Sequence, residues 1–225
     1  MKDDVMKYIK TCNPVVGCSI GCPSCGARKM NTRFKFIPNF SIPTLIEERL
    51  EKLYTKKGKI FVLTNMSDFC NWKDEWIKKI FEVIKNNPQN QYLILTKHPE
   101  KIKFQTELNN VWFGVNISNV KEKERIKHLR NNIKAKHYYI SFNPLLEDIG
   151  ILPLDQIEWI LIGGNIKDNK KQNIVKKSWI LNIVKKAKTK NIKVTMKYYL
   201  KDILECNQFI QELPIELERI LKRHL

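Results

Sequence analysis

The sequence lacks the features that mark membrane and secreted proteins. No apolar run in the 225-residue chain approaches the 18 residues of a membrane-spanning helix. The first ten residues contain two acids and no apolar core, so we do not expect a secretory signal. Hydrophobic residues make up 43% of the chain and charged residues 28%, an ordinary globular mixture. We therefore expect a cytoplasmic protein with no membrane partner.

Arginine is scarce compared with lysine. The net charge of +18 favours a nucleic-acid partner, because basic side chains neutralise phosphates. Only 7 of the 41 basic residues are Arg, however, and Arg is the side chain suited to bidentate phosphate contacts. Lys, Ile and Asn are all abundant, which is the composition that AT-rich codons produce. A solvated basic surface is the favoured interpretation, and nucleic acid stays a possible partner.

Linkers, internal repeats and low-complexity tracts are also absent, so residues 1–225 are expected to form a single domain. Short apolar runs alternate with amphipathic stretches at roughly 25–35 residues, the βα pattern of an α/β fold with a parallel sheet. No Gly-x-Gly-x-x-Gly motif is present. Six or seven strands fit a partial (βα)6-7 TIM-like barrel better than a dinucleotide-binding sheet. The expected strands are Tyr8–Thr11, Lys59–Leu63, Tyr92–Leu95, Val111–Ile117, His137–Phe142, Trp159–Ile162 and Lys193–Met196.

Helices are expected between these strands. Thr44 and Glu47 have the spacing of a capping box, which predicts a helix from there to about Lys57. An apolar stripe from Trp76 to Ile84 predicts a second helix. Pro99 is expected in the first turn of a third. Further helices are expected over Lys121–Asn131, over Trp179–Lys190 with Ser178 as its cap, and over Leu200–Leu225 with an interruption at Pro214.

Polar residues follow six of the expected strands. The carboxyl ends of parallel strands meet at one rim of the sheet, where ligands bind in folds of this kind. The sequence therefore predicts a binding site at this rim. The residues concerned are Asn65, Ser67 and Asp68; Thr96 and Lys97; Asn116 and Ser118; Ser141 and Asn143; Gly163, Gly164 and Asn165; and Lys197 and Tyr198.

Four of the six cysteines fall within 14 residues, from Cys12 to Cys25. Cys18, Cys22 and Cys25 have the spacing C-x3-C-x2-C, and thiolates suit zinc or iron–sulfur centres. A structural zinc site usually has four ligands in two pairs, and no second C-x2-C pair follows. Three thiolates on one loop favour a [4Fe–4S] cluster with one iron free of protein ligands. A non-enzymatic zinc- or nucleic-acid-binding module is the alternative.

The cysteine loop, placed after a first strand and ahead of a βα repeat, resembles that of the radical S-adenosylmethionine (SAM) superfamily. Seven segments together resemble a small subgroup first catalogued among bacteriophage-related proteins: CNPVVGCSIGCPSCGARKMNTRF, FVLTNMSDF, YLILTKHPEKI, NVWFGVNIS, ISFNPLL, WILIGG and VTMKYYLKDI. The resemblance implies a first strand and cluster loop in 1–30, βα repeats in 31–200 and a C-terminal helical region in 201–225.

The resemblance also implies the cofactors. Cys18, Cys22 and Cys25 would hold a [4Fe–4S] cluster whose open iron binds SAM, and a reductant such as flavodoxin or ferredoxin would supply the electron. Ser24 stands where the family usually has an aromatic residue, so Phe69 or Ile117 is expected to contact the adenine instead. The expected SAM-binding residues are Asn65, Ser67, Thr96, Lys97, Asn116, Ser118 and Ser141.

Within the subgroup, the similarity to a queuine-cleaving branch implies a 7-deazaguanine base as substrate. Its C–N bond would be broken to give 7-aminomethyl-7-deazaguanine. Asp68 and Lys197 are the candidate catalytic residues, although Asp68 is equally suited to cap the next helix. A radical SAM enzyme acting on DNA or RNA, as a lesion lyase or a base-modifying enzyme, is the alternative. The candidate substrate-binding residues are Asp68, Asn143, Gly163, Asn165, Lys197 and Tyr198.

Overall fold

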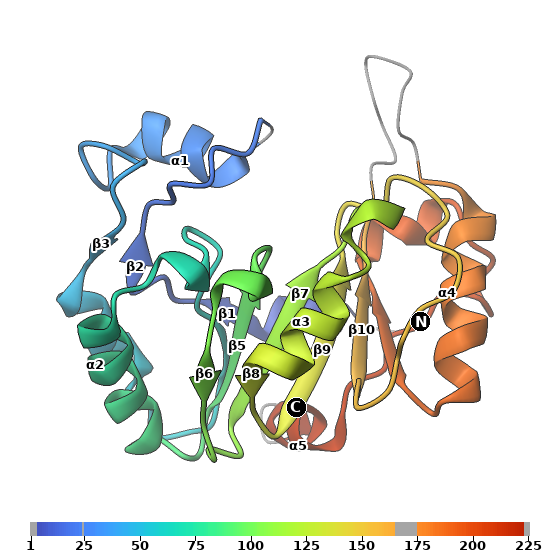
Figure 1. Cartoon of the computed structure of the whole chain (residues 1–225). Helices are drawn as coiled ribbons and strands as arrows, with labels where there is room; N and C mark the ends of the chain where they lie inside the picture. The colour runs from blue at the N-terminus through green and yellow to red at the C-terminus, as the bar shows by residue number, and fades with distance from the viewer. Residues whose placement is uncertain (1–3, 24, 165–174, 223–225) are drawn as a thin grey trace.

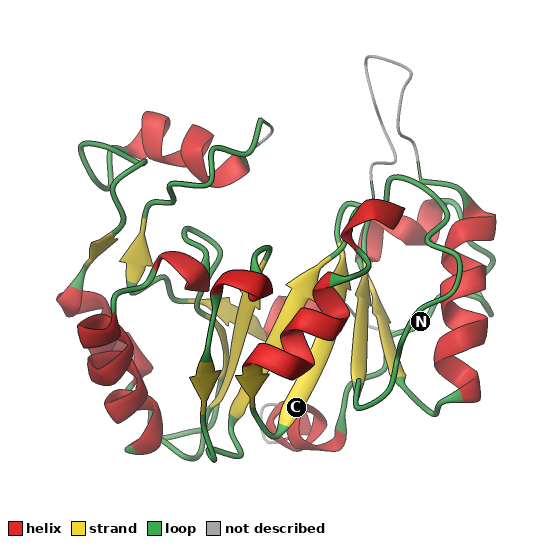
Figure 2. Ribbon diagram, viewed as in Figure 1, coloured by secondary structure: helices red, strands yellow, loops and turns green. Residues whose placement is uncertain are grey.

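Seven parallel strands form one sheet that curls into a half-barrel (Figures 1 and 2). The computed structural model describes residues 4–23, 25–164 and 175–222. The strands follow one another across the sheet in chain order, without the reversal that marks a doubly wound sheet. The expected α/β fold with a parallel, partial barrel is thus confirmed at this level. The strands are β1 (Ile9–Thr11), β4 (Ile60–Val62), β5 (Gln91–Thr96), β7 (Val111–Asn116), β9 (His137–Phe142), β10 (Trp159–Ile162) and β11 (Lys193–Met196).

Two small pairs of strands lie outside this sheet. β2 (Val15–Val16) pairs antiparallel with β3 (Thr44–Leu45), and this pair carries the cysteine loop between its strands. β6 (Phe104–Gln105) pairs in parallel with β8 (Ile133–Lys134). The cysteine loop is therefore anchored by a ladder of its own.

Five α-helices complete the described part of the chain. The second, third and fourth pack on the outer face of the sheet, whereas α5 closes the lower end of the half-barrel in Figure 1. None of the helices in the described ranges has the length and apolar character needed to cross a membrane. The helices are α1 (Gly26–Phe34), α2 (Asp74–Lys85), α3 (Arg125–Asn132), α4 (Lys177–Thr189) and α5 (Ile215–Lys222).

Several helix predictions were wrong in their details. Thr44 pairs with Val16 in the β2–β3 ladder, so it does not cap a helix, and only a 3-10 helix, Glu47–Leu53, follows. Pro99 begins a 3-10 helix of three residues, because the chain then enters β6.

The other helix corrections concern the ends of helices. The N-cap residue of α4 is Lys176 rather than the predicted Ser178, which lies inside the helix. The expected helical region after Leu200 contains a 3-10 helix, Tyr198–Asp202, and then no helix until α5, because Gln211 bridges to Thr195 of β11. Helix α1 was not predicted at all, since its cap is a cysteine, Cys25, whose sulfur accepts from the Arg28 backbone N–H.

Alternate residues of each strand face opposite sides of the sheet. On the outer face, Phe61, Ile94 and Phe113 belong to the large core that includes α2 and α3. On the inner face near the amino ends of the strands, Trp112 and Trp159 pack with Leu217 of α5 in a second core. The amino end of the half-barrel is therefore filled with apolar side chains.

The inner face becomes polar toward the carboxyl ends. Trp112, Gly114 and Asn116 of β7 lie on this face at two-residue intervals, as do Tyr139 and Ser141 of β9. A Cβ atom on Gly114 would lie 2.4 Å from the Tyr139 ring, so glycine is needed where that ring crosses β7. Burial raises the pKa of the Tyr139 hydroxyl. The Tyr139 ring thus separates the apolar core below from the polar residues above.

Candidate functional site

A cavity of about 240 Å³ lies at the carboxyl ends of the strands, beneath the cysteine loop. It brings together side chains from the loop and from four strand ends that are far apart in the sequence. Ten of the predicted site residues line its wall: Cys18, Cys22, Cys25, Asn65, Ser67, Asp68, Lys97, Asn116, Ser141 and Asn143.

The cysteine loop is held over this cavity by backbone hydrogen bonds. The Gly17 N–H donates to the Met66 carbonyl at 2.9 Å, and the Cys18 N–H donates to the Phe40 carbonyl at 2.7 Å. Gly17 has φ +106° and Gly21 has φ +74°, conformations that favour glycine. A Cβ atom on Gly17 would also lie 3.0 Å from the Phe40 carbonyl oxygen. These two glycines let the loop turn tightly around the three cysteines.

Arg28 is a residue of the site that the sequence analysis missed. Its guanidinium donates to the Cys18 carbonyl at 3.4 Å and to the Ser41 hydroxyl at 3.1 Å. The same group lies over the Phe40 ring, 5.1 Å from the ring centroid. Arg28 therefore ties α1 to the start of the cysteine loop. No motif in the sequence indicated this role, because it depends on how the chain folds back to bring Arg28 next to Cys18 and Ser41.

The donor set of the loop consists of thiols. Burial raises the pKa of the Cys18 thiol, so a metal or cluster that binds it must displace its proton. The Lys97 ammonium lies 3.9 Å from the Cys22 sulfur, so a cation from β5 reaches the cysteine loop. Within the described ranges, no three Cys, His, Asp or Glu side chains are already arranged as a metal site. The loop supplies three soft ligands, and binding would have to draw them together.

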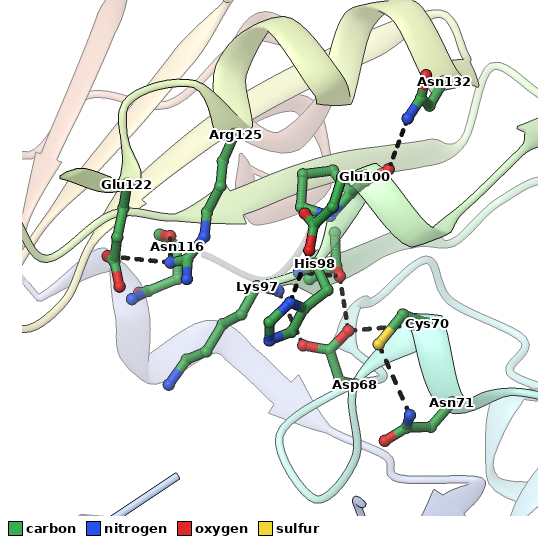
Figure 3. Close-up of polar contacts among 12 residues, drawn as sticks. Asp68, Cys70, Asn71, Lys97, His98, Glu100, Asn116, Glu122, Arg125 and Asn132 are labelled. Carbon is green, nitrogen blue, oxygen red and sulfur yellow. Dashed lines mark hydrogen bonds and ion pairs between the residues drawn. The ribbon is translucent and has the colours of Figure 1, made fainter. Parts of the chain in front are cut away.

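Asp68 acts as a structural anchor at this rim (Figure 3). One of its carboxylate oxygens accepts from the Thr96 hydroxyl at 2.6 Å and from the Cys70 N–H at 3.1 Å. The other oxygen accepts from the Lys97 N–H at 2.8 Å. Asp68 is buried and caps the 3-10 helix Phe69–Asn71, so the capping interpretation is confirmed. The geometry makes it a positioning residue that fixes the end of β5.

Thr96 and Lys97 therefore have different surroundings. The Thr96 hydroxyl is buried and bonds to Asp68 and to the His98 N–H, and Thr96 is not on the cavity wall. The Lys97 side chain extends away from the Asp68 carboxylate in Figure 3 and lines the cavity. Of these two predicted SAM-binding residues, only Lys97 presents its side chain to the cavity.

The Asn116 amide connects the ends of neighbouring strands. In the orientation that satisfies both of its ends, its nitrogen donates to the carbonyl oxygens of Asn143 and Ser141, at 2.9 and 3.3 Å. Its oxygen accepts from the Ser118 hydroxyl at 3.2 Å. The Asn116 carbonyl accepts from Arg125 at 2.8 Å. Asn116 therefore orders the rim, and Ser118, which is not on the cavity wall, reaches the site only through it.

Gly163, a predicted substrate-binding residue, is approached closely by side chains of the protein itself. A Cβ atom there would lie 2.4 Å from the Asn143 side-chain oxygen and 2.8 Å from the Tyr199 hydroxyl. The Tyr199 hydroxyl accepts from the Gly164 N–H at 3.1 Å. The protein's own side chains thus occupy the space above Gly163. Asn165, another predicted substrate-binding residue, lies outside the described residues.

Two other predicted substrate residues do not line this cavity. Lys197 continues the inner face of β11, where burial lowers the pKa of its ammonium and Asp4 opposes that shift. The Tyr198 ring packs against Phe209 and beneath the Lys201 ammonium. Tyr198 is therefore already in contact with the chain itself.

The residues expected to replace an aromatic side chain in the loop are not on the cavity wall. Phe69 lies within an aromatic cluster that includes Phe104 and Phe113, and Ile117 is fully buried in the same outer core. Phe40 is the aromatic residue that does line the cavity. The sequence offered no signal for Phe40, because it stands in the connection between α1 and β3.

Comparison with known protein families gives one match. Residues 5–206 match the model of a family described as "Protein of unknown function (DUF5131)". The chain belongs to this family. The matched span includes the cysteine loop and every strand of the half-barrel, so the family model covers the whole cavity. A search of curated proteins and a search of solved structures found no match.

Proposed function

We propose that this protein is a radical SAM enzyme, a queuine lyase that cleaves the C–N bond of queuine to give 7-aminomethyl-7-deazaguanine. The observation that carries the proposal is the cavity itself. Three thiols in C-x3-C-x2-C spacing and a polar rim share one wall at the carboxyl ends of parallel strands. The proposal includes the inference that the half-barrel is a partial TIM-like barrel.

The donor set fits a three-ligand cluster. Asp68 is the one carboxylate among the residues that line this cavity, and both of its oxygens already accept hydrogen bonds. Cys12 is buried elsewhere and its sulfur lies 3.3 Å from the Arg49 carbonyl oxygen. Among the described residues of the wall, no fourth ligand therefore competes, and Cys18, Cys22 and Cys25 would hold a [4Fe–4S] cluster.

When bound, such a cluster would supply the electron for the reductive cleavage of SAM, which is the source of radical chemistry on the substrate. The chain's own residues bind and align the reactants. The Lys97 ammonium offers a positive charge to the SAM carboxylate. Phe40 offers an apolar surface to the adenine. Asn116 and Asp68 hold the rim in the geometry that these contacts need.

The base and the leaving amine need other groups. Asn143 lines the cavity and carries both a donor and an acceptor, as recognition of a deazaguanine edge requires. The bond that breaks joins the cyclopentenediol carbon to the amine nitrogen, and the nitrogen leaves with the deazaguanine as an amine. The cyclopentene fragment, which has lost one hydrogen atom, would take one electron from the reductant and one proton. Lys197 lies outside the cavity wall, and burial lowers the pKa of its ammonium; it is our candidate to protonate the amine nitrogen, so the bound base would have to extend to it.

The test uses protein purified without oxygen and reconstituted with iron and sulfide. It is incubated with dithionite, SAM and queuine, and both 5′-deoxyadenosine and 7-aminomethyl-7-deazaguanine are measured. We expect both products in equal amounts. Protein that binds iron and sulfide but forms neither product would overturn the assignment, and protein that binds a single zinc ion would select the zinc module.

The net charge of +18 favours a second candidate, a radical SAM enzyme acting on DNA or RNA. Formation of 5′-deoxyadenosine that depends on an oligonucleotide rather than on queuine would select it. Its binding should weaken steeply as the salt concentration rises.

A further inference from the structure

Helix α1 and the loop after it carry an exposed surface next to the cysteine loop. Four large apolar side chains are exposed there: Met30 by 48%, Phe34 by 54%, Phe36 by 39% and Ile42 by 62%. We call these four residues, with the exposed bases Lys29, Arg33 and Lys35, the α1 surface. Met30 and Phe34 are one turn apart on α1, and the rings of Phe34 and Phe36 pack against each other. An exposed apolar cluster of this kind marks a site of interaction with another molecule.

The charge of this part of the chain has one sign. Residues 5–46 contain six Lys or Arg and no Asp or Glu, although the chain has 23 acids. The next acid, Glu47, pairs with Lys79 at 2.6 Å. In the described part of the chain, none of the ion pairs includes Lys29, Arg33 or Lys35. The α1 surface therefore presents positive charge, which attracts a partner with an acidic surface.

The α1 surface is also adjacent to the three cysteines. Cys25 is the N-cap of α1, and the helix from Gly26 to Phe34 is only about 13 Å long at 1.5 Å per residue. Arg28 links the same helix to the Cys18 carbonyl. A molecule bound on α1 would thus sit close to a cluster held by the loop.

A protein partner fits this surface better than a nucleic acid. The Arg33 guanidinium lies over the Phe34 ring at 5.0 Å, and that of Arg49 lies over the Phe36 ring at 5.3 Å. The two rings also pack against each other, with their centroids 5.7 Å apart. A guanidinium already lies over a face of each ring, which leaves less ring surface for stacking with nucleic-acid bases. Small apolar patches ringed by charge suit the transient contacts of redox proteins.

We propose that the α1 surface docks an acidic one-electron carrier protein, which reduces the cluster. The inference rests on the proposed function, because it needs a cluster in the cysteine loop. In this step the carrier loses one electron and the cluster gains it, and no bond forms or breaks. The basic side chains steer the carrier, and Met30, Phe34 and Phe36 provide the apolar contact.

Charge reversal on α1 tests the proposal. The variant K29E/R33E changes two exposed bases of α1, and K185E/K188E makes the same change on α4, at the opposite side of the molecule in Figure 1. Formation of 5′-deoxyadenosine is measured with reduced flavodoxin as the acidic carrier, and again with dithionite. We expect K29E/R33E to lower kcat/KM for flavodoxin by about tenfold at low salt, because steering charges act mainly on association. The dithionite-driven rate should stay within about twofold, and K185E/K188E should change neither.

Iron and sulfide contents of each variant serve as the folding control, and Phe34→Ser, which keeps the charge, serves as a second variant with a smaller expected loss for flavodoxin. Equal losses with both reductants, or no loss with flavodoxin, would overturn the docking surface while the enzyme assignment stands. If K29E/R33E lost binding to a single-stranded oligonucleotide while its kinetics with flavodoxin were unchanged, the surface would be assigned to nucleic acid and the proposed carrier docking would be overturned. A wild-type protein that forms no 5′-deoxyadenosine with dithionite would overturn the proposed function first.

Discussion

Inside the half-barrel, the same strands place apolar side chains at their amino ends and polar side chains at their carboxyl ends. At the amino ends, Trp112 and Trp159 are fully buried and pack with Leu217 of α5. At the carboxyl ends, Asn116 and Ser141 line a cavity beneath the cysteine loop. Only three residues lie between Trp112 and Asn116 along β7. One short strand therefore serves stability at one end and a candidate site at the other.

This contrast explains why the polar end can exist. Polar side chains at a rim cost little when the rest of the strand is anchored by apolar burial, and buried polar groups cost least when they are hydrogen-bonded. Asp68, Thr96 and Asn116 are all buried and all hydrogen-bonded. Changes at the amino end should therefore affect stability, whereas changes at the carboxyl end should affect ligand binding and activity.

The largest effect is expected at the carboxyl end. Cys22→Ala removes one of three ligands, so we expect iron and sulfide contents to fall to background and 5′-deoxyadenosine formation to drop by at least about a thousandfold, the loss of the cofactor's chemistry. Cys206→Ala, at an exposed cysteine, is the matched control and should behave as wild type. A Cys22→Ala protein that keeps its cluster and its activity would contradict the assignment of the ligands.

At the amino end the expected effect is on stability. Leu217→Ala removes a fully buried side chain of α5, which should lower the free energy of unfolding by about 2–5 kcal/mol. Ile215→Ala on the same helix, where the side chain is 48% exposed, should cost far less. Urea unfolding measures both. If Leu217→Ala instead abolished SAM binding in protein that is still folded, the two ends would not be independent.

Asp68→Asn is expected to weaken the hydrogen bonds that join Asp68 to the end of β5. The amide keeps the shape but loses one acceptor, so either the Lys97 N–H or the Thr96 hydroxyl loses its partner. We expect the KM for SAM to rise by about tenfold with a smaller change in kcat, since a lost hydrogen bond to a charged group costs about 1.5–3 kcal/mol. Asp202→Asn, at an exposed position, is the control. A large fall in kcat with unchanged KM would instead assign Asp68 to the chemistry.

The smallest effect is pH-dependent and belongs to the amino end. His137 stacks on Trp112 and lies 3.0 Å from Glu158. Burial alone would lower the pKa of His137, but the hydrogen bond and charge of Glu158 raise it above its usual value. A raised pKa stabilises the fold at pH values below the unfolded value of about 6.5, and this stabilisation is lost as pH rises through the folded pKa.

Glu158→Gln should therefore lower the free energy of unfolding by about 0.5 kcal/mol near pH 6 and by little near pH 8.5, the size expected for a partly exposed ion pair. Urea unfolding at the two pH values measures the difference, with Glu107→Gln, which breaks the exposed pair with Lys136, as the control. An equal loss at both pH values would show that the His137 charge is not involved.

The strands were predictable because each is a run of apolar residues bounded by polar ones. The structure places strands at all seven expected positions, with ends that shift by at most one residue. The helices were less predictable. Thr44 has the local signature of a cap, but its backbone pairs with Val16, so a tertiary contact overrides the local preference. Helix α1 was missed because a thiol performs the capping that Ser, Thr, Asp or Asn usually performs.

The candidate site was predictable as a set of residues but not in the role of each. The period of two places Lys97, Asn116 and Ser141 on the inner face, and the structure brings them to one cavity. Thr96, one residue earlier than Lys97, points to Asp68 instead. Gly163 is next to Asn143 and Tyr199, which a linear reading does not reveal.

The sequence by itself determined the order of strands, the apolar and polar ends of each and the three thiols on one glycine-bearing loop, because these follow from residue type and spacing along the chain. Only the tertiary structure decided that Asp68 is an anchor, that Arg28 and Phe40 belong to the site and that Tyr198 is already engaged. The physical reason is that the role of a polar or aromatic side chain depends on the neighbours with which it bonds or packs. In the folded protein those neighbours come from distant parts of the chain.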